Sequence, residues 1–154
     1  MDIHFVFDCD GTLVDTSSGR YELFPGIKEI LLSLSRKGIL TVWTARDQLS
    51  AVRILKENQV YNLFHSLYTS DDEFPKPLPR GLYELTHGAP RHLVYVIGDT
   101  AMDMMGAKNY GARAIGAIWN KSSSESLLAE AGADFIASTP EEGLAWLESQ
   151  ISIK

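Results

Sequence analysis

The chain alternates short apolar runs with segments of helical periodicity, and this alternation restricts the fold more than any other feature. Runs rich in aliphatic and aromatic residues, typical of strands buried on both faces, span residues 3–7, 40–43, 67–69, 93–97 and 113–118. Strands that alternate with helices indicate a parallel sheet with helices on both faces. We therefore predict an α/β fold, a three-layer α/β/α sandwich around a mainly parallel, Rossmann-like sheet.

The segments between these runs show the spacing of amphipathic helices. Apolar residues recur at i, i+3, i+4 and i+7 in residues 27–34, and similar spacing marks a second helix in residues 49–55. Further helices are predicted over residues 82–87, 102–109, 124–131 and 140–151, the last with Thr139 as its N-cap. No repeat or linker interrupts the pattern, so we expect a single domain over residues 1–154.

Size, charge and cysteine content narrow the functional classes. A chain of 154 residues with 45% hydrophobic content suits one buried core. The net charge of -6 disfavours bulk nucleic-acid binding and anionic membranes, because both attract basic surfaces. One cysteine forms neither an internal disulfide nor a zinc cage. The sequence also has no secretory signal pattern and no apolar stretch of about 18 residues, so we expect a cytoplasmic protein without membrane association.

Acidic residues follow the first predicted strand in a dense pattern. Asp8 and Asp10 belong to the segment DCDGTLVD, whose fixed positions would arise by chance in such a chain on the order of once in 10⁵. Further polar residues stand beyond later apolar runs: Thr44, Lys76, Asp99 and Asp103. Ligands of such sheets bind beyond the carboxyl ends of the strands. We therefore expect these side chains to converge at one edge of the sheet.

Carboxylates gathered at one edge require a cation. The candidate metal-binding residues are Asp8, Asp10, Asp99 and Asp103. Two carboxylates about 4 Å apart repel by roughly 4 kcal/mol at an effective dielectric of about 20. Oxygen ligands suit Mg²⁺, which takes one or two carboxylates, several waters and a substrate phosphate oxygen. Lys76 adds positive charge, so the sequence predicts a magnesium-dependent site for phosphoryl transfer.

These motifs, in this order, resemble those of the haloacid dehalogenase (HAD) superfamily over essentially the whole chain. The resemblance implies an HAD-like fold in which Asp8 attacks phosphorus and forms an aspartyl-phosphate. It implies that Asp10 protonates the leaving oxygen, later activates water and offers its backbone carbonyl to the metal. Family members that do not hydrolyse phosphate monoesters often carry another residue type at this second position. Asp10 therefore favours a phosphatase over a dehalogenase or a transport ATPase.

The remaining motif residues carry roles implied by the same resemblance. Thr44 would donate a hydrogen bond to a phosphoryl oxygen, and Lys76 would steady both the nucleophile and the transferring group. Asp99 would ligate Mg²⁺, whereas Asp103 would either ligate it through water or orient Lys76. Thr44 and Lys76 thus join the two aspartates of the first motif as the candidate catalytic residues.

Substrate contacts are expected from two short segments. Gly11 and Thr12 permit a sharp turn that brings backbone N–H groups near the phosphate. Ala45 and Arg46 directly follow Thr44, and Arg46 has two open interpretations: it holds a second anionic group of the substrate, or it is a charge at the start of the next helix.

HAD enzymes commonly carry a cap domain between the first and second motifs or between the second and third. The intervals from Asp8 to Thr44 and from Thr44 to Lys76 are each used up by a turn, a helix and a strand. We therefore predict a capless phosphatase whose site is open unless residues 12–24 or a neighbouring subunit of a homo-oligomer cover it. The second half is similar to the core of phosphoglycolate-phosphatase-like members, whose cap this sequence lacks.

The predicted function is hydrolysis of a phosphate monoester, with a small molecule as the expected substrate. An open site leaves a macromolecular substrate, a phosphoprotein or a nucleic-acid end, as the alternative. A receiver-like phospho-acceptor module is least favoured, because a receiver needs no Asp-x-Asp followed by Gly-Thr.

Overall fold

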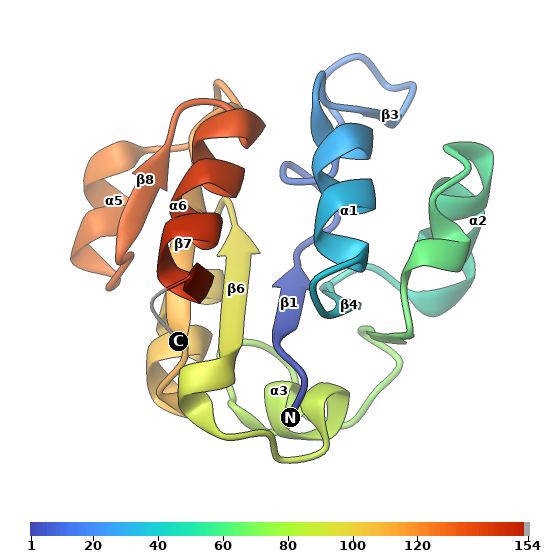
Figure 1. Cartoon of the computed structure of the whole chain (residues 1–154). Coiled ribbons are helices and arrows are strands. Elements are labelled where there is room, and N and C mark those ends of the chain that lie inside the picture. The colour runs from blue at the N-terminus through green and yellow to red at the C-terminus, as the bar shows by residue number, and fades with distance from the viewer. Residues whose placement is uncertain (153–154) are drawn as a thin grey trace.

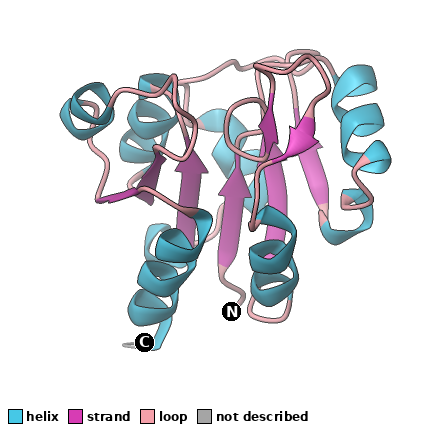
Figure 2. Cartoon of the chain, turned by 90° about the horizontal axis from the view of Figure 1, so that it is seen from above, coloured by secondary structure: helices cyan, strands magenta, loops and turns pink. Residues whose placement is uncertain are grey.

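The computed structural model describes residues 1–152, and in these residues a parallel sheet has six strands in the order β5-β4-β1-β6-β7-β8. The strands are β1 (His4–Phe7), β4 (Ile39–Trp43), β5 (Ser66–Tyr68), β6 (Val94–Gly98), β7 (Arg113–Ala117) and β8 (Phe135–Ala137). Figure 2 shows the long strands running in one direction, with loops gathered at the edge where they end. The predicted Rossmann-like α/β class is confirmed.

Helices cover both faces of the sheet. One face carries α1 (Ile27–Ser35), α2 (Gln48–Glu57) and α6 (Pro140–Ser152), with α1 and α6 side by side in Figure 1. The other carries α3 (Arg80–Thr86), α4 (Ala101–Tyr110) and α5 (Glu125–Glu130). Single 3₁₀ turns precede β5 and β6, at Tyr61–Leu63 and Arg91–Leu93. Within residues 1–152, none of the helices combines the length and apolar character needed to cross a bilayer.

The central strand β1 is buried on both faces, which fixes the position of the residue that follows it. Phe5 and Phe7 pack under α1, α2 and α6, whereas Val6 packs under α3 and α4, as the alternation of a strand requires. Phe7 pairs with β4 on one side and with β6 on the other. The next residue, Asp8, donates its backbone N–H to the carbonyl of Ile97 at 3.0 Å. Asp8 therefore lies at the middle of the edge of the sheet where the strands have their carboxyl ends.

The five strands predicted from apolar runs are confirmed, and no bound is shifted by more than one residue. The capping of α6 is confirmed too, because the Thr139 hydroxyl accepts the backbone N–H of Glu142 at 3.1 Å. The sequence did not predict β8, nor the small hairpin of β2 (Val14–Asp15) and β3 (Glu22–Leu23). These strands are only two or three residues long, so a period-two pattern has little room to show, and β5, which has the same length as β8, was predicted only from its apolar run.

No separate folded unit is inserted between the strands that carry the motifs, within residues 1–152. Between β1 and β4 the chain forms only the hairpin and α1, and between β4 and β5 only α2 and a 3₁₀ turn. The fold therefore lacks a cap at both places where the family resemblance would put one.

Two leucines offer a matched test of the packing. Leu34 of α1 is fully buried, whereas Leu49 of α2 is 81% exposed. Leu34→Ala is expected to lower the free energy of unfolding by about 2–5 kcal/mol, because it removes buried methyl groups and leaves a cavity. Leu49→Ala should change it by less than about 0.5 kcal/mol. Urea unfolding followed by circular dichroism measures both, and equal losses would contradict this description of the core.

Candidate active site

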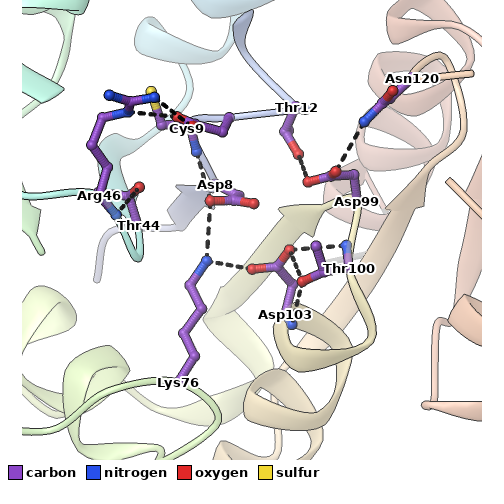
Figure 3. Close-up of polar contacts among 11 residues, drawn as sticks. Asp8, Cys9, Thr12, Thr44, Arg46, Lys76, Asp99, Thr100, Asp103 and Asn120 are labelled. Carbon is purple, nitrogen blue, oxygen red and sulfur yellow. Dashed lines mark hydrogen bonds and ion pairs between the residues drawn. The ribbon is translucent and has the colours of Figure 1, made fainter. Parts of the chain in front are cut away.

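The structure brings the predicted side chains together at the carboxyl edge of the sheet (Figure 3). Asp8, Thr44 and Asp99 directly follow the central strands β1, β4 and β6. Asp103 comes from the first turn of α4, and Lys76 comes from the loop between β5 and α3. Because neighbouring parallel strands end at the same edge, residues far apart in the chain become neighbours in space.

Three carboxylates form the centre of the site. Asp8, Asp99 and Asp103 each offer an oxygen, and these oxygens lie within 4.8 Å of one another. Burial raises the pKa of Asp8 well above its usual range, the charges of Asp103 and Asp99 raise it further, and Lys76 opposes them. Burial also raises the pKa of Asp99. A desolvated group of carboxylates is a set of oxygen donors that fits a hard divalent cation such as Mg²⁺.

Lys76 is the cation that contacts this group. Its Nζ lies 3.1 Å from Oδ1 of Asp8 and 2.5 Å from Oδ1 of Asp103, and it sits 5.1 Å from the ring centre of Trp43. Burial alone would lower the pKa of Lys76, but the carboxylates of Asp103 and Asp8 outweigh it and raise the pKa above its usual range. One ammonium facing three carboxylates leaves an excess of negative charge, which a further cation would neutralise.

Asp99 is oriented by donors from two other loops. The Thr12 hydroxyl donates to its Oδ1 and the Asn120 amide donates to its Oδ2, both at 3.0 Å. Thr12 is held in turn by Trp119, whose indole N–H donates to the Thr12 carbonyl at 2.9 Å. Gly11 approaches the same carboxylate so closely that an added Cβ would lie 2.1 Å from it. Asn120 was not predicted, although its place shortly after the strand-like run 113–118 was an available signal.

The Asp103 carboxylate contacts both the N-terminus of α4 and Lys76. Its Oδ2 accepts the backbone N–H and the hydroxyl of Thr100, at 3.1 and 2.8 Å, and the Thr100 hydroxyl accepts the N–H of Asp103 in return. This reciprocal pair is a capping box at the start of α4. Since Oδ1 contacts Lys76, the contacts of Asp103 match the second of its two expected roles, the orientation of Lys76.

Asp10 does not belong to this group of three carboxylates and instead contacts Arg46. The Arg46 guanidinium donates from Nε to Oδ1 at 2.9 Å and from Nη2 to Oδ2 at 2.7 Å. The backbone N–H of Arg46 donates to the Thr44 hydroxyl at 3.0 Å. Arg46 was expected to bind a substrate anion or to be a charge at the start of the next helix; it stands directly before the N-cap of α2 and has an acidic partner inside the protein.

A cleft of about 1010 Å³ opens over these residues. Its walls include Asp8, Asp10, Thr44, Ala45, Arg46, Lys76 and Met102, and also Asp72 and Glu73 of the loop before Lys76. Thr44 is almost fully buried at its base. Cys9 lies under the site and is fully buried; burial, followed by the charges of Asp10 and Asp8, raises the pKa of its thiol far above its usual range. The thiol is therefore a poor nucleophile.

Comparison with a curated sequence links the chain to a known protein over most of its length. It is 32% identical over 111 residues to a protein of Dickeya dadantii (strain 3937) described as "Probable phosphatase IndB". The aligned region covers 70% of this chain and 48% of that protein, so the chain spans about half the length of this relative.

Solved structures share the fold at lower identity. A haloacid dehalogenase-like family hydrolase, SP0104 from Streptococcus pneumoniae, has 22% identity and a TM-score of 0.85, over 95% of this chain and 98% of that one. A putative beta-phosphoglucomutase from Thermotoga maritima has 19% identity and a TM-score of 0.84, over 97% and 99% of the two chains. These likenesses concern the fold.

A protein-family model described as "Haloacid dehalogenase-like hydrolase" matches residues 17–117, more than half of the chain. The enzyme class predicted from the sequence motifs, a hydrolase of the haloacid dehalogenase superfamily, agrees with this match. The chain belongs to the haloacid dehalogenase-like hydrolase family.

Proposed function

We propose that this protein hydrolyses phosphate monoesters with Asp8 as the nucleophile. The observation that carries the proposal is the placement of the Asp8 carboxylate, at the end of the central strand, in the wall of the cleft and 3.1 Å from the Lys76 ammonium. The curated relative described as a probable phosphatase supports this reaction over others in the family. A second aspartate at Asp10, in reach of the same cleft, supports it as well.

The first step transfers the phosphoryl group to the protein. A carboxylate oxygen of Asp8 attacks phosphorus, and the bond from phosphorus to the alcohol oxygen breaks. The electron pair of that bond stays on the leaving oxygen, which takes a proton from the carboxyl group of Asp10. The Thr44 hydroxyl donates to a phosphoryl oxygen, and Lys76 offsets the negative charge.

The second step releases phosphate. Water attacks the phosphorus of the aspartyl-phosphate and gives its proton to the carboxylate of Asp10. The bond between phosphorus and Asp8 breaks, so inorganic phosphate leaves and the Asp8 carboxylate is restored. Asp10 thereby regains the proton that it lost in the first step.

Mg²⁺ is the proposed cofactor. The carboxylates of Asp8 and Asp99 and the backbone carbonyl of Asp10 would hold it, and Asp103 would contact it through water. The donors that orient Asp99, the Thr12 hydroxyl and the Asn120 amide, support this assignment because ligating carboxylates are themselves usually hydrogen-bonded. When bound, the ion supplies neutralising charge to the phosphoryl oxygens.

A small molecule is the proposed substrate. Small-molecule sites typically have volumes of about 300–1,000 Å³, and the cleft measures about 1010 Å³. A phosphoprotein is the second candidate, because within residues 1–152 no inserted unit covers the cleft. The net charge of -6 weighs against a nucleic-acid end. Comparison of kcat/KM for phosphorylated metabolites and phosphopeptides separates the two.

Replacement of the nucleophile tests the reaction. Asp8→Asn is expected to lower turnover of an aryl phosphate with Mg²⁺ by a factor of at least about 100, because an amide cannot form the aspartyl-phosphate. The exposed Asp2→Asn is the matched control and should leave the rate unchanged. Equal rates for wild type and Asp8→Asn would refute the assignment.

Stability with and without magnesium tests the metal site. Because the pKa values of Asp8 and Asp99 are raised in the folded state, the metal-free protein binds more protons than the unfolded chain. Their contribution to the free energy of unfolding therefore falls as pH rises from about 4 through the raised pKa values. Saturating Mg²⁺ should offset this loss at neutral pH, by about 2.7 kcal/mol at 100 times its dissociation constant. At about pH 4, protons compete with Mg²⁺ for the carboxylates, so Mg²⁺ should have little effect on stability.

Thermal melting in Mg²⁺, against NaCl of equal ionic strength with EDTA, measures this difference. A stabilisation by Mg²⁺ that is as large at acid pH as at neutral pH, or absent at neutral pH, would contradict a site built from these carboxylates.

A further inference from the structure

The geometry points to Arg46 as a positioning residue that holds the Asp10 carboxyl group at the reacting oxygen; this inference rests on the proposed hydrolysis. Arg46 meets Asp10 with two hydrogen bonds, one to each carboxylate oxygen, of 2.9 and 2.7 Å. Such a planar fork fixes the rotation of a carboxyl group as well as its place, which a point charge cannot do. The pair therefore sets the direction in which the free lone pairs of Asp10 point.

Asp10 has reason to need such a partner. Its side chain is 41% exposed, so packing alone does not restrict its rotamers, whereas the side chain of Arg46 is only 20% exposed. Each carboxylate oxygen has two lone-pair directions, and the fork uses one on each oxygen. The second direction on an oxygen that faces the cleft is the one through which Asp10 would exchange a proton with the leaving oxygen or with water.

Arg46 is itself held from three sides. Its guanidinium lies 5.0 Å from the ring centre of Tyr21, and Nη1 donates to the Ser50 hydroxyl of α2 at 3.3 Å. Tyr21 stands in the β2–β3 hairpin, and its carbonyl accepts the Asn58 side-chain amide at the end of α2 at 2.9 Å. The backbone of Arg46 is fixed by the Thr44 hydroxyl. The hairpin and α2 therefore hold the Arg46 guanidinium in the position from which it contacts Asp10.

The competing interpretation is that Arg46 binds the substrate. In that case the guanidinium would leave Asp10 and contact the transferring phosphoryl group or a second anion. The two roles differ in what the loss of Arg46 changes. A substrate-binding arginine acts on every ester alike, whereas a residue that acts through Asp10 matters most when the leaving oxygen needs a proton.

Two esters whose phosphate is the sole charged group separate these roles. n-Propyl phosphate releases a strongly basic alkoxide and depends on proton donation, whereas p-nitrophenyl phosphate releases a stable phenolate. The parameter to measure is kcat/KM, which covers the steps up to departure of the leaving group. Arg46→Ala is expected to lower it by about 10- to 100-fold for the alkyl ester, and several-fold less for the aryl ester, because misplaced catalytic groups cost up to about 100-fold.

A double-mutant cycle with Asp10→Asn gives an independent readout. If Arg46 acts through Asp10, adding Arg46→Ala to Asp10→Asn should lower kcat/KM for the alkyl ester by no more than about twofold. Arg53→Ala is the matched control, because Arg53 lies in the following helix and pairs with Glu57 on the surface. This variant should match the wild type on both esters.

The inference would be overturned if Arg46→Ala lowered kcat/KM equally for the two esters and lowered it by the same factor in the Asp10→Asn background. Should Arg46→Ala fail to fold in a thermal melt, Arg46→Lys provides the test, because a lysine keeps the charge without the fork. Arg46→Lys should again lower kcat/KM more for the alkyl ester than for the aryl ester, and an equal decrease for both would overturn the inference. Failure of the proposed hydrolysis is recognised separately: the wild type would then turn over neither ester, or Asp8→Asn would remain active.

Discussion

The site depends on one electrostatic constraint: three carboxylates share a poorly hydrated space with a single ammonium group. Asp8, Asp99 and Asp103 lie close enough to repel one another strongly, and Lys76 neutralises only part of their charge. Such a group persists only if the surrounding fold forces it together. The free energy for this comes from the apolar core, which is large enough to hold a locally unfavourable cluster at its edge.

The sheet imposes this arrangement through its strand order. The chain places β1 between β4 and β6, so three strands far apart in sequence end side by side and deliver Asp8, Thr44 and Asp99 to one edge. Burial of β1 on both faces prevents it from shifting, because a slip by one residue would exchange its two apolar faces. Side chains on the surrounding loops then need only short hydrogen bonds to complete the site. Strand pairing therefore fixes where the backbones of Asp8, Thr44 and Asp99 lie, and hydrogen bonds from the loops fix the orientation of their side chains.

Sequence reasoning predicted the elements whose signal is local. The apolar runs and the DCDGTLVD segment sufficed for five of the six strands of the sheet, for its parallel order and for the convergence of Asp8, Lys76 and Asp99. It did not predict β8, whose three residues show little pattern, or the amide of Asn120, which stands after the run 113–118 and reaches Asp99 because β7 and β6 are neighbours. The partner of Arg46 was equally hidden, since one arginine after a strand has many possible partners and the path of the loop selects among them.

The double use of Asp103 links the site to the formation of a helix. One oxygen of this carboxylate closes the first turn of α4 and the other contacts Lys76, so the two structures share a single side chain. A local opening of the α4 N-terminus would separate Asp103 from Lys76, and the proposed reaction centre would lose one carboxylate without global unfolding. Amide hydrogen exchange at the start of this helix therefore reports whether the contact between Asp103 and Lys76 is intact, although the exchanging N–H groups take no part in that contact.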